Sequence, residues 1–220
     1  ARCGDYLLFR AEGLLDPLVP PPPDAWAEVL RGLSVVGGPG EYAPLILDDH
    51  NRLYRDRYWH FERMLVDALT RRAGTWVPHL DWALLREGLD RIFPPSAETD
   101  WQRVAAALAV LRPFCVISGG PGTGKTRTVT SILALLVEQA GDRIPRIGLA
   151  APTGKAAARL SESIHHAKAQ LGLDPGIADQ IPEDAQTLHR LLGFRPGRAN
   201  PRHGPEDPLH LDLLVVDEAS

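Results

Sequence analysis

Cysteine, long apolar runs and positive charge are all scarce in this sequence, and each shortage argues against a class of protein. The two cysteines, Cys3 and Cys115, lie far apart and form no Cys-x-x-Cys or Cys/His cluster, which argues against a disulfide framework or a zinc site. No apolar stretch reaches the roughly 18 residues that a membrane-spanning helix needs, and residues 1–5 lack the apolar core of a signal peptide. The sequence therefore predicts a protein of the reducing cytoplasm with no membrane partner.

Positive charge does not dominate, because 24 Lys and Arg residues face 28 Asp and Glu residues, for a formal net charge of -4. A free-standing nucleic-acid-binding protein is more often clearly basic, so any contact with DNA has to be local. The chain opens on Ala1 rather than Met, which suggests an internal fragment. What is present, 220 residues with 44% hydrophobic content, suits one or two domains with a sizeable core.

The first hundred or so residues predict a small, mainly helical domain. Two short apolar runs, 44–47 and 53–54, flank a polar turn and predict a hairpin. A stripe of apolar side chains at helical spacing follows and predicts a helix with a buried face. The stripe includes Tyr58, Phe61 and Leu65. Because Pro94 and Pro95 indicate a boundary, we expect an N-terminal domain at residues 1–97 and a second domain at residues 98–220.

Beyond this boundary, short apolar runs alternate with helical patterns. The runs at 114–118, 147–151 and 213–216 each lead into a polar or glycine-rich turn. Such alternation is typical of a parallel sheet flanked by helices, which is an α/β fold. Ligands of these sheets bind at the carboxyl ends of the strands. The turns after the three runs are therefore the places to look for chemistry.

The turn after the first run matches G-x-x-x-x-G-K-[ST] and precedes a predicted helix, which is the context that a P-loop requires. Its backbone N–H groups would cradle the phosphates of ATP. Lys125 would neutralise the β- and γ-phosphate oxygens during catalysis, and Thr126 would hold Mg²⁺. With the strand pattern, the motif predicts the RecA-like type of P-loop NTPase fold. The predicted nucleotide-binding residues are Gly119, Gly120, Pro121, Gly122, Thr123, Gly124, Lys125 and Thr126.

Two acids follow the third apolar run. Asp217 could join the coordination sphere of Mg²⁺, and Glu218 could orient and deprotonate the attacking water as the catalytic base. A solvated strand end is the alternative interpretation of an Asp-Glu pair at this place. The upstream P-loop favours the interpretation of Asp217 and Glu218 as catalytic residues.

The second run is followed by a turn that could bind another phosphate chain. Thr153, Gly154 and Lys155 would present a hydroxyl, backbone N–H groups and a cation, separate from the groups that bind the nucleotide. This combination suits a nucleic-acid backbone. An ordinary strand-to-helix turn with a solvated Lys155 is the alternative.

In order along the chain, these motifs resemble helicase motifs I, Ia, Ib-like and II of superfamily 1, at residues 119–126, 151–160, 186–193 and 217–220. With residues 101–107 they resemble the RecD family, the helicase subunits of RecBCD (exodeoxyribonuclease V), from the N-terminal part to motif II. The resemblance implies ATP-dependent, 5′-to-3′ unwinding of double-strand DNA ends in recombinational repair. It also implies single-stranded DNA contacts from Thr187 and His189 and an adenine contact from Gln102. An exposed helix residue is the alternative for Gln102.

The resemblance reaches the N-terminal part as well. Residues 44–47 and 52–59 are similar to the small RecD domain that docks on RecC, so the implied partners are RecB and RecC in a heterotrimer. Nothing in the sequence resembles the carboxylate cluster of a nuclease. Two alternatives stay open: a free-standing RecD-like helicase, and an AAA+-type remodelling or loader ATPase. The long gap between Lys125 and Asp217, with a Thr-Gly-Lys turn inside it, disfavours the AAA+ alternative.

Overall fold

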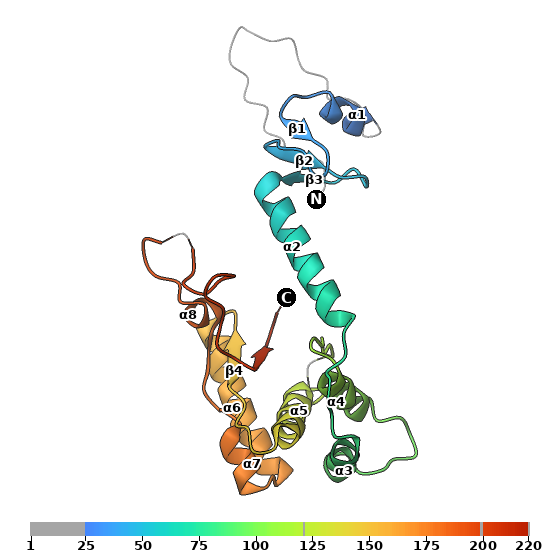
Figure 1. Ribbon diagram of the computed structural model, residues 1–220, viewed down its shortest axis with the longest axis vertical. Coiled ribbons are helices and arrows are strands. Elements are labelled where there is room, and N and C mark those ends of the chain that lie inside the picture. Colours follow the sequence, from blue (N-terminus) through green and yellow to red (C-terminus); the bar gives the residue numbers. More distant parts are fainter. Residues whose placement is uncertain (1–24, 121, 199, 220) are drawn as a thin grey trace. The chain divides into compact units, whose positions relative to one another are not determined.

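The computed structural model describes residues 25–120, 122–198 and 200–219, and these form two compact units that divide between Ala68 and Leu69 (Figure 1). Helix α2 runs across the division. The elements up to α2 are α1 (Trp26–Arg31), β1 (Val36–Gly37), β2 (Leu45–Leu47), β3 (Leu53–Arg55) and α2 (Asp56–Ala73). The later elements are α3 (Trp82–Ile92), α4 (Trp101–Leu111), α5 (Lys125–Ala140), β4 (Ile147–Ala151), α6 (Gly154–Leu171), α7 (Pro175–Gln180), β5 (Ala185–Thr187), α8 (Leu188–Leu191) and β6 (Leu213–Val216).

The first unit contains the predicted hairpin, because β2 and β3 pair antiparallel. Asp48 organises the turn between them: its Oδ1 accepts the N–H groups of His50 and Arg52 at 3.0 and 2.8 Å, and its Oδ2 accepts Arg52 Nε at 2.7 Å. Strand β1 adds a parallel neighbour to β2 and completes a three-stranded sheet. The sequence did not predict β1, since two residues are too few to show a periodic pattern.

The predicted helix after the hairpin is α2, but its apolar stripe is not buried. Tyr58, Phe61 and Leu65 are 58%, 51% and 57% exposed. The guanidinium of Arg57 lies 5.2 Å from the centroid of the Phe61 ring, an arrangement that attracts a cation to an aromatic face. The predicted burial is therefore wrong, because periodicity identifies an apolar face without showing whether another element covers it.

The sheet of the second unit has the strand order β5-β4-β6, and all its pairs are parallel. Strands β4 and β6 have the predicted bounds, which confirms a parallel α/β arrangement. The predicted strand at 114–118 is wrong: among the described residues, this segment belongs to no sheet, and Val116 is 73% exposed. An apolar run becomes a strand only when a neighbour takes up its backbone hydrogen bonds.

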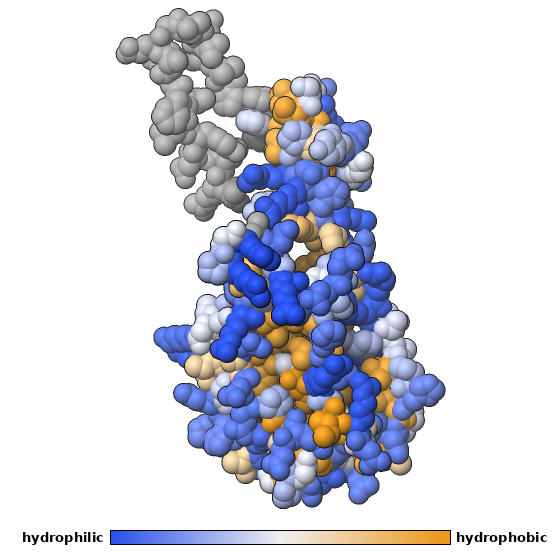
Figure 2. All heavy atoms as spheres, turned by 60° about the vertical axis from the view of Figure 1, so that its left-hand side comes forward, coloured by the Kyte–Doolittle hydropathy of each residue, from blue (hydrophilic) through white to orange (hydrophobic). Residues whose placement is uncertain are grey.

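Helix α5 occupies the middle of the second unit, between α4 and α6 (Figure 1). Its Leu133 and Leu135 are almost fully buried and share one apolar core with Val110 of α4, Leu149 of β4 and Ile164 of α6. This core packs the helix that follows the P-loop against α4 and α6. Hydrophilic residues, with apolar patches among them, cover much of the face shown in Figure 2.

Helix α3, which the sequence placed in the N-terminal domain, contacts α5 in the second unit. The approach depends on Gly88, where a Cβ atom would lie 2.5 Å from Cδ2 of Leu135. Leu85 and Leu89 of α3 contribute to the same core as α5. The domain boundary after residue 97 stays a prediction, while the compact units divide earlier in the chain.

Candidate nucleotide and nucleic-acid sites

The P-loop has the backbone that its glycines predict. Gly122 and Gly124 adopt φ values of 73° and 79°, which side chains rarely tolerate. Gly124 is the N-cap residue of α5, and a Cβ atom there would lie 2.8 Å from Nε2 of Gln102. A Cβ atom at Gly119 would lie 2.7 Å from Oγ1 of Thr123. The positive φ values favour glycine at positions 122 and 124, and a side chain at 119 or 124 would need Thr123 or Gln102 to move. Pro121 lies outside the described residues.

Lys125 turns back onto the loop, and its Nζ donates to the carbonyl oxygens of Gly119 and Gly120 at 2.6 and 2.8 Å. An ammonium group has three donors, so a third hydrogen bond to a phosphate oxygen is possible from this position. Thr126 follows in the first turn of the 16-residue α5, where the positive end of the helix dipole favours an anion. The loop, the cation and the helix start thus provide the groups that a triphosphate needs.

Gln102 touches the P-loop. Its Nε2 donates to the carbonyl oxygen of Thr123 at 2.9 Å, which links α4 to the loop before α5. The N-cap Asp100 begins α4 by accepting the backbone N–H groups of Gln102 and Arg103. Gln102 is half-buried beside the loop. Its predicted contact with adenine stays a prediction.

Asp217 and Glu218 follow β6 at the carboxyl edge of the sheet. The N–H of Asp217 extends the ladder by donating to Ala150 of β4 at 2.9 Å. Glu218 is exposed and has a φ of 50°, in the left-handed region that few non-glycine residues adopt. Such residues cluster at active sites, where the surrounding structure holds them.

In the described part of the chain, no hydrogen bond or ion pair joins these two acids to Lys125 or Thr126. Because 114–118 is outside the sheet, strand pairing does not set the position of the P-loop relative to Asp217. Mg²⁺ in phosphoryl-transfer sites is usually held by one or two protein oxygens together with substrate phosphates. The hydroxyl of Thr126 and the carboxylate of Asp217 are of the right chemical type for this role.

The predicted DNA-binding residues come together at the same edge. Ala151, the last residue of β4, pairs in register with Thr187, the last residue of β5. Thr153 caps α6 by accepting the N–H of Ala156 at 3.2 Å, and Thr187 caps α8 by accepting the N–H of Arg190 at 3.2 Å. Each hydroxyl uses a lone pair for its cap and keeps a hydrogen that can be donated to a phosphate oxygen.

The surroundings of the β4–α6 turn are open. Thr153, Gly154 and Lys155 are all exposed, and no atom lies within 4 Å of a Cβ atom built on Gly154. Helix α6 has 18 residues, so its first N–H groups carry the partial positive charge of a long helix. The turn can therefore receive a phosphate without rearrangement.

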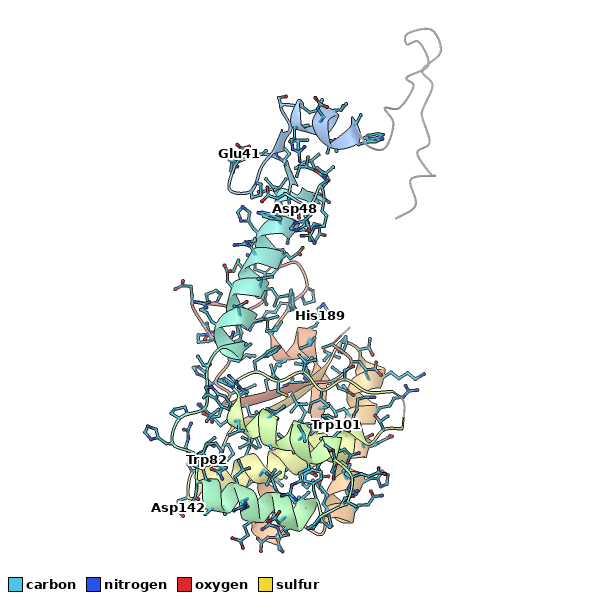
Figure 3. The ribbon with its side chains drawn as sticks, turned by 90° about the vertical axis from the view of Figure 1, so that its right-hand side faces the viewer. Glu41, Asp48, Trp82, Trp101, Asp142 and His189 are labelled. Atoms are coloured by element: carbon cyan, nitrogen blue, oxygen red, sulfur yellow. The ribbon has the colours of Figure 1, made fainter. Side chains whose placement is uncertain are left out.

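His189 lies on the short helix α8 and is exposed (Figure 3). Its ring centroid is 5.0 Å from that of Phe194, with an interplanar angle of 48°. The sequence did not single out Phe194, because one aromatic residue at the start of a Pro/Gly-rich loop forms no recognisable pattern. The glycine immediately before it, at a helix end, was the available clue.

A protein-family model described as an AAA domain matches residues 102–220, which is more than half of the chain. The chain belongs to the AAA-domain family. The matched residues include Gln102, the P-loop, the β4–α6 turn and α8, and they extend to Asp217 and Glu218.

Curated relatives agree with the predicted resemblance and confirm it. The chain is 37% identical to the RecBCD enzyme subunit RecD of Haemophilus influenzae over 207 residues, covering 90% of this chain and 32% of that protein. It is 40% identical to RecD of Mycobacterium tuberculosis H37Rv over 226 residues, covering 99% of this chain and 36% of that protein. It is also 36% identical over 140 residues to the ATP-dependent RecD2 DNA helicase of Deinococcus radiodurans, covering 64% of this chain and 16% of that protein.

The chain spans about a third of the length of the RecD relatives that it matches. The match to RecD of Mycobacterium tuberculosis includes residues of both the first unit and the motif-bearing second unit. Within the described residues, no helix has the length and apolarity needed to cross a membrane.

Proposed function

We propose that this chain is the nucleotide-binding part of an ATP-dependent DNA helicase of the RecD type. In this proposal it serves a RecBCD-like complex in the cytoplasm, where the complex unwinds double-strand DNA ends in the 5′-to-3′ direction for recombinational repair. The observation that carries the proposal is a glycine-restricted P-loop at the start of α5, in a unit whose sheet ends in Asp217 and Glu218. The identities to RecD subunits support the same function.

The proposed nucleotide chemistry assigns one task to each group. Lys125 leaves its contacts with Gly119 and Gly120 in part and neutralises the β- and γ-phosphate oxygens of ATP. Thr126 and Asp217 hold Mg²⁺, which would neutralise charge on the phosphates. Glu218 orients a water molecule and accepts its proton. Gln102, already in contact with the P-loop, recognises the adenine edge.

The proposed DNA track lies at the ends of β4 and β5. Thr153, Gly154, Lys155 and Thr187 bind backbone phosphates of single-stranded DNA, and His189 contacts the strand beside them. Contacts of this kind position a strand without reading its sequence. The local cations suit a chain whose net charge is -4, because the attraction for DNA is confined to one edge of the sheet.

A loader or remodelling ATPase of the AAA+ type is a weaker proposal. The second phosphate-binding turn, at Thr153 to Lys155, has no evident task in such a protein. The relatives also favour the helicase, since two of them are RecBCD subunits by name and a third is a DNA helicase. We propose RecB-like and RecC-like subunits as partners, with the N-terminal unit as the docking part.

The first prediction tests the P-loop in the full-length protein. Lys125→Ala should lower DNA-stimulated ATP hydrolysis by about 10²-fold or more, because the developing phosphate charge loses its nearest cation. Arg86→Ala is the matched control, since Arg86 is an exposed cation on α3. Steady-state ATPase assays with and without single-stranded DNA provide the measurement. Turnover of Lys125→Ala equal to that of Arg86→Ala would contradict the proposal.

A further inference from the structure

The contact between His189 and Phe194 is built by the end of α8. Gly193 has a φ of 72°, and the backbone closes with Gly193 N–H donating to Arg190 and Phe194 N–H donating to His189 at 3.1 and 3.0 Å. This is a Schellman arrangement, in which a glycine in the left-handed region reverses the chain after a helix. The reversal brings the Phe194 ring against the His189 ring.

The returning loop braces this arrangement. Arg202 N–H donates to the carbonyl of Gly193 at 3.3 Å, and His203 N–H donates to that of Leu192 at 3.1 Å. A Cβ atom on Gly193 would lie 2.9 Å from Cβ of Arg202, so the loop comes close to the backbone there. The ring pair is therefore held from both sides of the helix end.

Packing alone does not account for the pair. An apolar contact often accompanies a Schellman arrangement, and its usual purpose is to bury two aliphatic or aromatic groups. Here one member is a histidine, Phe194 is 40% exposed, and His189 is exposed as well. Both residues thus remain accessible to solvent, at a place where the glycine reverses the chain.

The position of the pair adds a second observation. Thr187, the N-cap residue of α8, pairs with Ala151, which lies two residues before Thr153 of the exposed β4–α6 turn. Arg190, also exposed, lies one residue after His189. His189 therefore follows, by two residues, a hydroxyl at Thr187 that lies at the same edge of the sheet as the β4–α6 turn. Aromatic faces beside a positively charged track are the combination that binds single-stranded nucleic acids.

We propose that Phe194 and His189 form a stacking platform for one base of a single DNA strand whose phosphates are bound by the Thr153–Lys155 turn. This inference rests on the proposed function and adds a base-binding residue, Phe194, to it. The platform accepts any base, since every base offers a π-face. It supplies affinity that does not depend on salt, whereas the phosphate contacts supply the salt-dependent part.

Binding of two probes by the full-length protein tests the proposal: a labelled oligothymidylate and a strand of equal length with abasic sugars. Phe194→Ala should bind oligothymidylate about tenfold more weakly, leave abasic-strand binding unchanged and keep the slope of affinity against salt. Lys155→Ala should weaken both probes and reduce that slope. Phe61→Ala, which removes another exposed aromatic ring, should change neither.

Phe194→Leu separates stacking from packing. A leucine preserves the apolar contact at the helix end but has no aromatic face, so the proposal expects it to bind oligothymidylate as weakly as Phe194→Ala does. Phe194→Trp should bind at least as tightly as the parent. If Phe194→Leu binds like the parent, or if Phe194→Ala weakens both probes equally, the platform is rejected. Failure of the proposed function is distinct, because the parent would then show neither strand binding nor Lys125-dependent turnover.

Discussion

At the scale of single residues, the site depends on backbone conformations as much as on side chains. Glu218 holds a φ of 50° two residues after the last residue of β6. Gly124 holds a φ of 79° at the residue that begins α5. A left-handed conformation costs an ordinary residue on the order of 1–2 kcal/mol. Glu218 therefore carries this cost, whereas glycine at position 124 avoids it.

Glu218→Gln in the full-length protein should bind ATP normally and lose most of its hydrolysis. The amide preserves the shape of the carboxylate but cannot accept a proton from water, and loss of general-base catalysis typically costs about 10²–10⁴-fold in rate. Equilibrium binding of labelled ATP and single-turnover hydrolysis separate the two effects. Glu98→Gln, at an exposed glutamate before α4, is the control. Full hydrolysis by Glu218→Gln would remove this residue from the mechanism.

Gly124→Ala should destabilise the loop and weaken ATP binding. Its Cβ atom would meet Nε2 of Gln102 at 2.8 Å, and the positive φ adds a strain of about 1–2 kcal/mol. Gly204→Ala is a matched control, because no atom lies within 4 Å of a Cβ atom there and its φ is not in the left-handed region. Thermal melting with and without ATP measures both effects. Equal melting temperatures for the two variants would contradict this account of the loop.

At the scale of elements, an ionic cluster links α6 to the segment before β5. Glu183 accepts hydrogen bonds from Lys168 Nζ and His165 Nδ1, each at 2.7 Å. Lys168 also donates to the carbonyl of Ile181 at 2.9 Å. The hydrogen bond from Lys168, and then that from His165, lowers the pKa of Glu183 below its ordinary value of 4.5. The cluster thus helps to position β5, and with it Thr187 and α8.

The stability that Glu183 contributes should depend on pH. A carboxyl group with a lowered pKa stabilises the fold above its ordinary pKa, and this contribution disappears as the pH falls through the folded-state value. Glu183→Gln should therefore melt at a lower temperature than the parent at pH 7, and the difference should shrink as the pH falls below 4.5 and through the lowered folded-state pKa. Glu162→Gln, at an exposed position of α6, is the control. A difference that persists unchanged at acid pH would show that the ionised carboxylate is not the stabilising form.

At the scale of the whole second unit, the central strand β4 connects the two candidate sites. Asp217, after β6, hydrogen-bonds to Ala150, while the next residue, Ala151, pairs with Thr187 at the start of α8. Because all three strands are parallel, the proposed metal ligand and the proposed DNA contacts emerge at one edge. A displacement of β4 would therefore reach both candidate sites, and under the proposed function it would offer a physical route for coupling ATP hydrolysis to movement along a strand.

Much of the local structure of this molecule follows from residues that lie close together in its sequence. The P-loop glycines and the bounds of β4 and β6 were predicted from the sequence, and short polar residues, Asp100 and Thr153, cap α4 and α6. Each depends on residues close together in the chain: a positive φ needs glycine, a helix start needs a short polar side chain, and a buried strand needs an apolar run.

Tertiary structure decided the features that depend on distant partners. The apolar run at 114–118 pairs with no strand among the described residues, and the stripe of α2 stays exposed. Conversely, β1 and β5 have only two and three residues, too few to show an alternating pattern, and they are strands because a neighbouring strand pairs with them. Phe194 meets His189 only after a glycine reverses the chain. Periodicity specifies which face of a segment is apolar, whereas the neighbour that covers or pairs with it comes from elsewhere in the fold.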